Sequence, residues 1–222
     1  MPLDSLTNGP YLGTTRNPFS YEKIEQVSRD LQTEWLTLDE ITQQLNLFQD
    51  ESQDTYLQSL ELATRFAIED YLGMSIFPIT WKVYYGATNG MTGTQSAFDL
   101  PEVSQAVNPA NPGVTVNAVK YWTDGTPTLI TVDPATYYYD NSGNKVVLQT
   151  LPSNLNASMT SPVYCEYTTA ANPLSTYPVI KQAALLLLTH LYNQRSNTVD
   201  KQLHEIPFGV ATLLRAYKPL VM

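Results

Sequence analysis

Three side chains in this sequence are typical of nucleophilic catalysis or zinc binding: one cysteine and two histidines. Cys165 with His190 or His204 offers a thiolate and a base, or part of a four-ligand zinc set. Their spacing fits neither a CxxC nor an HxxxH motif. Cys165 also alternates with Val163 and Tyr167, which is the spacing of one face of a β-strand. We therefore interpret Cys165 as a core thiol and predict no catalytic or metal site here.

Oxygen-bearing residues at alternate positions form a second candidate, because Asp140, Ser142 and Asn144 have the spacing of the first ligands of a calcium loop. Lys145 stands where that loop needs a glycine, and Leu151 stands where it needs a bidentate glutamate. The segment is therefore predicted to be the loop of a hairpin.

Acidic pairs and tyrosine runs are the remaining candidates for chemistry. Glu69 and Asp70 are expected on a solvated helix surface, where paired carboxylates are common and inert. The tyrosines at 84–85 and 137–139 are able to stack on sugars, but neighbouring residues of a strand point to opposite faces, so half of them belong to the core. We predict no enzymatic activity and no cofactor.

Composition narrows the class of protein further. The 222 residues are 43% hydrophobic and 15% charged, which excludes wholesale disorder, and the net charge is −9. Residues 1–73 carry 13 acids and 4 bases, whereas residues 74–222 carry 8 of each. A protein that binds nucleic acid needs clustered lysines and arginines, and the chain has no such cluster.

A single cysteine excludes an internal disulfide and favours assembly in a reducing cytoplasm. No basic and apolar leader follows Met1, so export by the usual signal is not expected. The most apolar stretch, residues 183–188, is far shorter than the roughly 20 residues that span a bilayer. We predict no membrane association.

Four helices are expected in an α+β fold. Thr37 and Glu40 have the spacing of a capping box, which predicts a helix over about 38–46. A second helix should cover 54–72 and end at Gly73. The others are expected over 179–195 and 208–217.

The segment from about 75 to 168 changes to alternating β-branched and aromatic residues, which predicts strands. Asp124-Gly125 and residues 140–144 are expected to be hairpin turns. Residues 86–112 form a long polar excursion, a feature that is usually functional or bound to a partner. The strands are expected at 79–85, 114–121, 129–132, 137–139, 145–148 and 163–167.

These segments suggest three regions. Residues 1–34 are interpreted as an N-terminal arm, within which 21–34 has the composition for a short helix. Residues 35–73 and 174–222 are expected to form a helical core. Residues 74–173 are expected to be a β-rich insertion that contains the loop 86–112.

The order of these elements is similar to the head-tail connector (adaptor) proteins of tailed bacteriophages, over about residues 35–218. The segments that carry the resemblance are Thr-Leu-Asp-Glu-Ile (37–41), 67–73, Trp81, Val119-Lys120-Tyr121, Asp124-Gly125, 162–167, 180–187 with His190, Tyr192, Asn193 and Arg195, and 207–210 with Leu213, Leu214 and Tyr217.

The resemblance implies a virion protein of the neck, assembled in the host cytoplasm. Such a protein forms a ring, usually twelve-fold, below the portal protein, extends the DNA channel and presents a platform to the next neck or tail protein. DNA passes through without specific binding. The alternative that the tyrosines and the β region leave open is a carbohydrate- or receptor-binding module of a phage particle; a hydrolase with an unrecognised site is a third.

Three sets of residues are predicted to act in such a ring. The helix 179–195 is apolar on two faces, so a neighbouring subunit is expected to cover one of them. The short apolar C-terminal tail is expected to dock on the portal, unless it packs on its own domain. Acids near the ends of the first two helices are expected to line the channel. The sets are Leu185, Leu188 and Tyr192 between subunits, Phe208, Val210, Leu213, Leu214 and Tyr217 at the portal, and Asp39, Glu40, Asp50, Glu51 and Asp54 in the channel.

Overall fold

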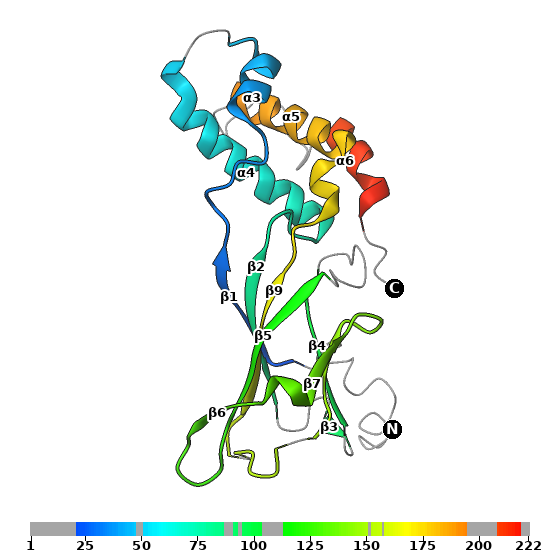
Figure 1. Ribbon diagram of the computed structural model, residues 1–222. Helices are drawn as coiled ribbons and strands as arrows, with labels where there is room; N and C mark the ends of the chain where they lie inside the picture. Colours follow the sequence, from blue (N-terminus) through cyan, green and yellow to red (C-terminus); the bar gives the residue numbers. More distant parts are fainter. Residues whose placement is uncertain are drawn as a thin grey trace, which may run out of the picture. The chain divides into compact units, whose positions relative to one another are not determined.

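The structure, a computed structural model, describes residues 21–47, 51–86, 91–92, 95–103, 113–150, 152–156, 158–194 and 208–218. The chain divides into two compact units (Figure 1). We call residues 1–29 with 78–170 the β unit, and residues 30–77 with 171–222 the helical unit. In the described residues no helix is both long enough and apolar enough to span a membrane.

The helical unit begins with helices whose ends are set by local sequence. Thr37 accepts a hydrogen bond from the backbone of Glu40, and the Glu40 side chain accepts one from the backbone of Thr37, which confirms the capping box. Gly73 ends the second helix in the left-handed conformation (φ 68°), which glycine adopts without strain. These elements are α3 (Leu38–Leu45), the 3₁₀ turn η1 (Glu51–Gln53) and α4 (Asp54–Leu72).

The second half of the helical unit follows the β unit in sequence. It consists of η3 (Pro173–Thr176), α5 (Pro178–Asn193), α6 (Phe208–Leu214) and η4 (Arg215–Tyr217). All four helices contribute to one hydrophobic core, which includes Ile41, Leu57, Ile68, Ile180, Leu187, Leu188, Val210 and Leu214.

The β unit contains a five-stranded antiparallel sheet with the order β1-β2-β9-β5-β6. Its register places Val83 opposite Cys165 and Cys165 opposite Val119, so these three side chains share the buried face. The strands are β1 (Lys23–Arg29), β2 (Ile79–Tyr85), β5 (Val114–Trp122), β6 (Leu129–Thr131) and β9 (Val163–Thr169).

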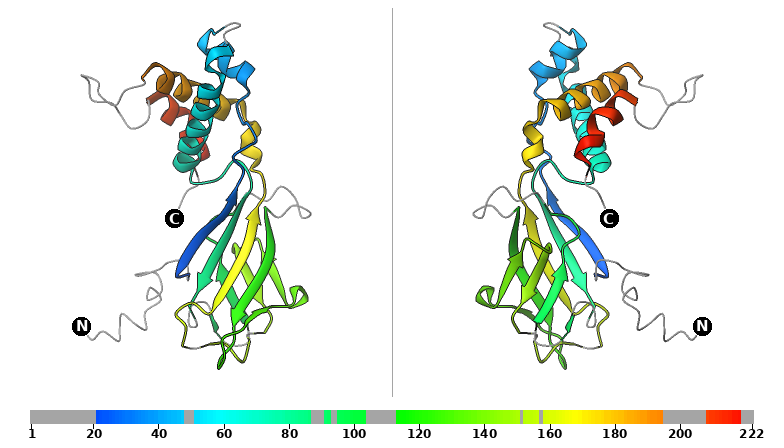
Figure 2. Two further views of the ribbon diagram at one scale, coloured as in Figure 1. Left: turned by 90° about the vertical axis from the view of Figure 1, so that its left-hand side faces the viewer. Right: turned by 90° about the vertical axis from the view of Figure 1, so that its right-hand side faces the viewer.

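A second, four-stranded antiparallel sheet has the order β3-β4-β8-β7 (Figure 2). Phe98, Val146 and Leu148 of this sheet join Val83 and Cys165 of the first in one core. Its elements are β3 (Met91–Thr92), β4 (Gln95–Asp99), β7 (Tyr137–Asp140) and β8 (Lys145–Leu148), with the 3₁₀ turn η2 (Pro134–Thr136) before β7.

Most of the predicted elements are present. The two hairpin turns join β5 to β6 and β7 to β8. The predicted helix 179–195 is observed as Pro178–Asn193, and the helix 208–217 is α6 followed by η4. Residue 195 lies outside the described residues.

Two expectations about the chain are wrong. Residues 23–29 form strand β1 instead of part of a short helix over 21–34, and residues 1–20 of the expected arm lie outside the described part. The excursion 86–112 contains β3 and β4, of which β4 pairs with β8. Both strands have few apolar residues. β1 is an edge strand, and Phe98 is the buried side chain among residues 97–99 of β4, whose burial the structure describes.

Candidate functional surfaces

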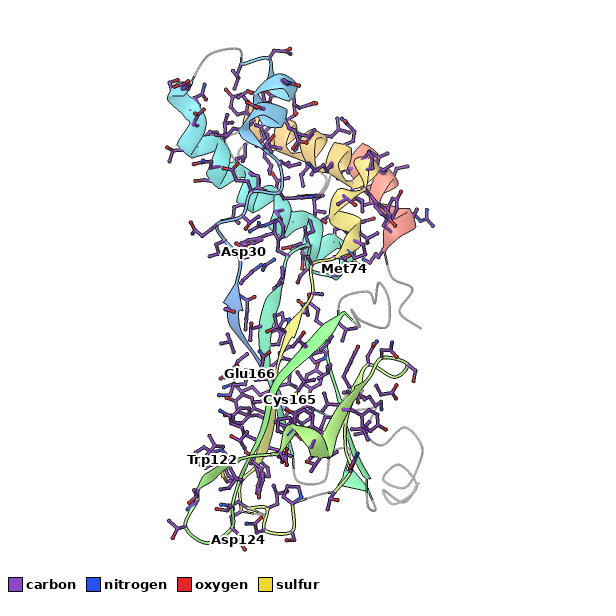
Figure 3. The ribbon with its side chains drawn as sticks, viewed as in Figure 1. Asp30, Met74, Trp122, Asp124, Cys165 and Glu166 are labelled. Carbon is purple, nitrogen blue, oxygen red and sulfur yellow. The ribbon has the colours of Figure 1, made fainter. Side chains whose placement is uncertain are left out.

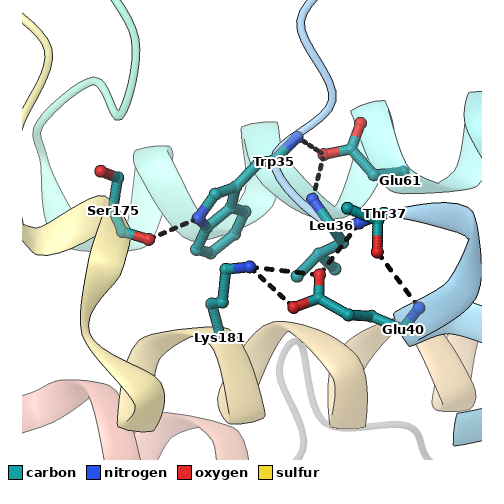
Figure 4. A network of polar contacts seen from close by, with 7 residues as sticks. All are labelled: Trp35, Leu36, Thr37, Glu40, Glu61, Ser175 and Lys181. Atoms are coloured by element: carbon teal, nitrogen blue, oxygen red, sulfur yellow. Dashed lines mark hydrogen bonds and ion pairs between the residues drawn. The ribbon is translucent and has the colours of Figure 1, made fainter.

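A polar network ties the start of α3 to α4 and α5 (Figure 4). The Glu61 carboxylate on α4 accepts hydrogen bonds from the backbone N–H groups of Trp35 (3.2 Å) and Leu36 (3.4 Å). The Trp35 indole donates to the carbonyl of Ser175 (2.9 Å). Lys181 of α5 forms an ion pair with Glu40 (2.8 Å). The network fixes the segment before α3 against both long helices.

The pKa values of the two glutamates in this network are shifted in opposite directions. Burial raises the pKa of Glu61, and it outweighs the attraction of Arg65 and the two backbone hydrogen bonds. Partial burial also raises the pKa of Glu40, but hydrogen bonds from Lys181 and Thr37 outweigh it, so the net pKa is lowered. Glu40 is thus held ionised by the fold, whereas the charge of Glu61 is disfavoured.

Arg65 is the largest fully buried side chain of the helical unit, with 1% of its surface exposed. Its two terminal nitrogens donate to the carbonyls of Thr33 (2.7 Å) and Asp30 (2.8 Å). The guanidinium also lies over the ring of Phe77, 4.9 Å from its centroid. Arg65 therefore holds the turn at residues 30–33 on α4. No spacing in the sequence signals this role.

Only part of the predicted acidic set lies on an open surface. Asp39 and Glu51 are exposed, Asp54 is half-buried, and Asp50 lies outside the described residues. The charge of Glu40 is balanced by Lys181. Glu69, expected on a solvated face, is buried and accepts a hydrogen bond from the backbone of Ile76 (2.7 Å), so that expectation is wrong. It binds the backbone shortly after α4 ends, which the sequence pattern does not reveal.

The second apolar face of α5 is largely covered by its own chain. Leu188 is fully buried in the helical core, so the reason for placing it between subunits is wrong. Leu185 and Tyr192 are half-buried against the same core, and the Tyr192 hydroxyl donates to Gln53 (3.0 Å). The large apolar side chain of α5 that stays most open is Leu186, at 39% exposed, followed by Val179.

The C-terminal helix α6 also packs on its own unit. Val210 (1% exposed) and Leu214 (fully buried) belong to the helical core, and Leu213 and Tyr217 pack partly against it. The Tyr217 ring meets that of Tyr177 edge to face, with centroids 5.8 Å apart. Val210 and Leu214 thus follow the alternative that the segment packs on its own domain, because they share a core with α5. Phe208 is the first residue of α6.

Cys165 lies within the β unit (Figure 3) and is fully buried, which confirms the core interpretation. Burial raises the pKa of its thiol far above the ordinary value. In the described residues no three His, Cys, Asp or Glu side chains gather closely enough to hold a metal ion. His190 lies on α5 and His204 lies outside the described residues.

The outward face of the five-stranded sheet is polar and aromatic, and it includes Tyr84, one of the tyrosines considered above for stacking on sugars. The Lys82 ammonium lies 4.3 Å from the centroid of Tyr164, whose ring is 5.6 Å from that of Tyr84. Glu25 of β1 accepts a hydrogen bond from the Tyr84 hydroxyl (2.8 Å). Of the tyrosines expected to display a ring, Tyr138 is the open one, at 50% exposed. The rings of Tyr84 and Tyr164 are thus in contact with side chains of their own sheet.

One open pocket of about 350 Å³ lies between the end of β4 and the β7–β8 hairpin. Lys145 and Asp99 on its wall form an ion pair with each other (2.9 Å). Its other lining residues are apolar or uncharged, and they add no nucleophile or histidine to this ion pair. They are Leu100, Pro101, Val103, Gly143 and Asn144.

Comparison with known proteins identifies the fold. No protein-family model matches the sequence, and no curated protein matches it either. Among solved structures, a chain from the neck of an empty gene transfer agent (GTA) particle with C6 symmetry has a TM-score of 0.60 at 18% identity. Chains from the virion of a native GTA particle, at 17% identity, and from the neck of a native GTA particle with C12 symmetry, at 18%, both have a TM-score of 0.57. Each match covers 90% of this chain and 97% of the other.

Proposed function

We propose that this chain is a structural protein of the neck of a phage-like particle, where it acts as a head-tail connector. The observation that carries the proposal is the fold that this chain shares with neck chains of GTA particles, over 97% of the length of each of those chains. Because the match covers 90% of this chain, it concerns the folds of both units and not one common motif. The resemblance of the sequence to connector proteins is independent of the fold and supports the same role.

In this role the chain forms a ring below the portal protein, with twelve copies as the expected number. The neck structures with C6 and C12 symmetry support cyclic assembly. On α5 the side chains suited to a contact between subunits are Leu186 and Val179, with the half-buried Leu185 and Tyr192 beside them. A buried aliphatic side chain such as Leu188 contributes to the fold of each subunit instead.

The ring extends the DNA channel and binds a protein on each side. The net charge of −9 suits a conduit, since a negative wall repels the duplex and does not retain it. Asp39 and Glu51 are the exposed candidates for this wall. On the portal side, Leu213 and Tyr217 remain candidates because each is only half-buried. The downstream neck or tail protein docks on the opposite face of the ring.

Deletion of the gene for this chain from the genome that encodes the particle tests the proposed role. A connector is needed to join the tail, so electron microscopy should show DNA-filled heads without tails, and a plasmid copy should restore complete particles. A receptor-binding module gives a different result: complete, tailed particles that no longer adsorb to cells. Tailed particles from the deletion strain would overturn the connector proposal.

A further inference from the structure

Both edges of the five-stranded sheet carry exposed aliphatic side chains. β1 and β6 are its outermost strands among the described residues, and Figure 2 shows β1 outermost beside β2, β9 and β5. Ile24 on β1 is 37% exposed, and Leu129 and Ile130 on β6 are each 37% exposed. An edge strand presents unpaired backbone groups, and apolar side chains make it suited to pairing with another chain.

Ile24 and Ile130 lie on the same face of the sheet, the face that covers the core. Ile24 is opposite Val83, a fully buried core residue. Ile130 is opposite Tyr121, which in turn is opposite the core residue Val163. Directly opposed residues of an antiparallel pair point to one side. The buried layer of the sheet thus ends at a half-exposed isoleucine at each edge.

The directions of the strands allow one edge to join the other in a second copy. All four neighbouring pairs of this sheet are antiparallel, so the first strand, β1, and the fifth, β6, run in the same direction. Neighbouring copies in a ring of many subunits are related by a small rotation, so their strands keep nearly the same direction. β1 of one copy is therefore suited to pair in parallel with β6 of the next, with the core faces of both sheets on one side.

We propose that β1 of each subunit pairs with β6 of its neighbour, so that the five-stranded sheets join around the ring and Ile24 covers the open side of Ile130. The inference rests on the proposed ring and names the surface that closes it. A contact between two different edges is heterologous, which is the kind of contact that builds closed rings.

A bulge in β1 limits the length of this contact. The register of β1 against β2 shifts between Gln26 and Ser28, which leaves Val27 without an opposed residue and 53% exposed. Regular pairing is thus available over Lys23–Gln26, and β6 is only three residues long. A short edge with a bulge resists unlimited strand addition. The pairing should hold when other contacts in the ring support it.

Cross-linking between introduced cysteines tests the pairing directly. Lys23→Cys and Thr131→Cys place thiols at exposed positions on the outward face of the two edges. Native Cys165 is fully buried and does not compete for the reagent. Rings are assembled on portal, treated with a short bis-maleimide and separated on a denaturing gel. The matched control combines Lys23→Cys with Asn141→Cys, an exposed residue of the β7–β8 loop.

The expected pattern is directional. Each single variant alone should stay monomeric on the gel, a mixture of the two should give dimers, and the double variant should give a ladder up to the ring number. Dimers from a single variant, or as much product from the control pair, would overturn the edge pairing. Rings that form without the dimers would also overturn it while leaving the connector role intact. Failure to form any ring would instead contradict the connector proposal itself.

Discussion

At the scale of single residues, the helical unit depends on charged side chains that face inward. Arg65 and Glu61 are buried on α4, and each satisfies backbone groups of the segment that leads into α3. A buried guanidinium is tolerated only when hydrogen bonds replace its water. These contacts order a stretch of chain that has no helix or strand of its own.

Glu40 provides a test of this polar network through its pH dependence. Its pKa in the folded chain is below the ordinary 4.5, so its ionised form stabilises the fold at neutral pH and that contribution is lost as the pH falls through the folded pKa. Glu40→Gln should lower the free energy of unfolding by about 0.5–1 kcal/mol at pH 7, the range of a solvent-accessible ion pair. The difference in the free energy of unfolding between the variant and the wild type should disappear as the pH is lowered.

Urea unfolding at several pH values, followed by circular dichroism, measures this difference. Asp39→Asn is the matched control, because it removes a carboxylate from an exposed position of the same helical turn. A loss in Glu40→Gln that is equally large at pH 7 and at pH 3 would contradict an ionic contribution.

At the scale of elements, local signals were sufficient wherever one short segment determines the structure. The capping box predicted α3, Gly73 predicted the end of α4, and β8 was predicted at its observed bounds, 145–148. β1 and β4 lacked such a signal. Ile24 and Val27 are the apolar residues of β1, and a strand at an edge needs no alternating pattern because little of it is buried.

The surfaces of α5 and α6 could not be predicted, because their cover comes from distant parts of the chain. The sequence shows that α5 is apolar on two faces, but it does not show that α6 covers one of them. Leu188 and Leu214 were therefore assigned to contacts with other proteins, while both are fully buried within one subunit. The burial of Arg65 and Glu61 escaped prediction for the same reason.

The packing of α6 leads to a prediction about stability. Leu214 is fully buried against the core of the helical unit. Leu214→Ala should lower the free energy of unfolding by about 2–4 kcal/mol, because it removes buried surface and leaves a cavity. Thermal unfolding measures the loss, and Ala216→Ser, at an exposed position of η4, should change the stability by less than about 0.5 kcal/mol. An unchanged melting temperature for Leu214→Ala would show that α6 is free for docking.

At the scale of the whole molecule, the chain of 24.8 kDa carries two hydrophobic cores, and among its described residues no cluster of His, Cys, Asp or Glu side chains could hold a metal ion. In the proposed ring each unit would supply a surface for a repeating contact: the exposed part of α5 in the helical unit, and the two sheet edges in the β unit. A ring needs such contacts on both sides of every subunit. In the proposed ring, the surplus of acids in residues 1–73 would suit a channel wall that repels DNA.

Electron microscopy of the purified chain mixed with the portal protein of its own particle tests whether the chain assembles as a connector. Class averages should show a ring with cyclic symmetry on one face of the portal, with twelve copies expected, around an open central channel. Because connectors can be monomeric alone, the portal must be present in the mixture. A chain that remains monomeric beside intact portal rings, at a concentration well above that of the portal, would contradict the account.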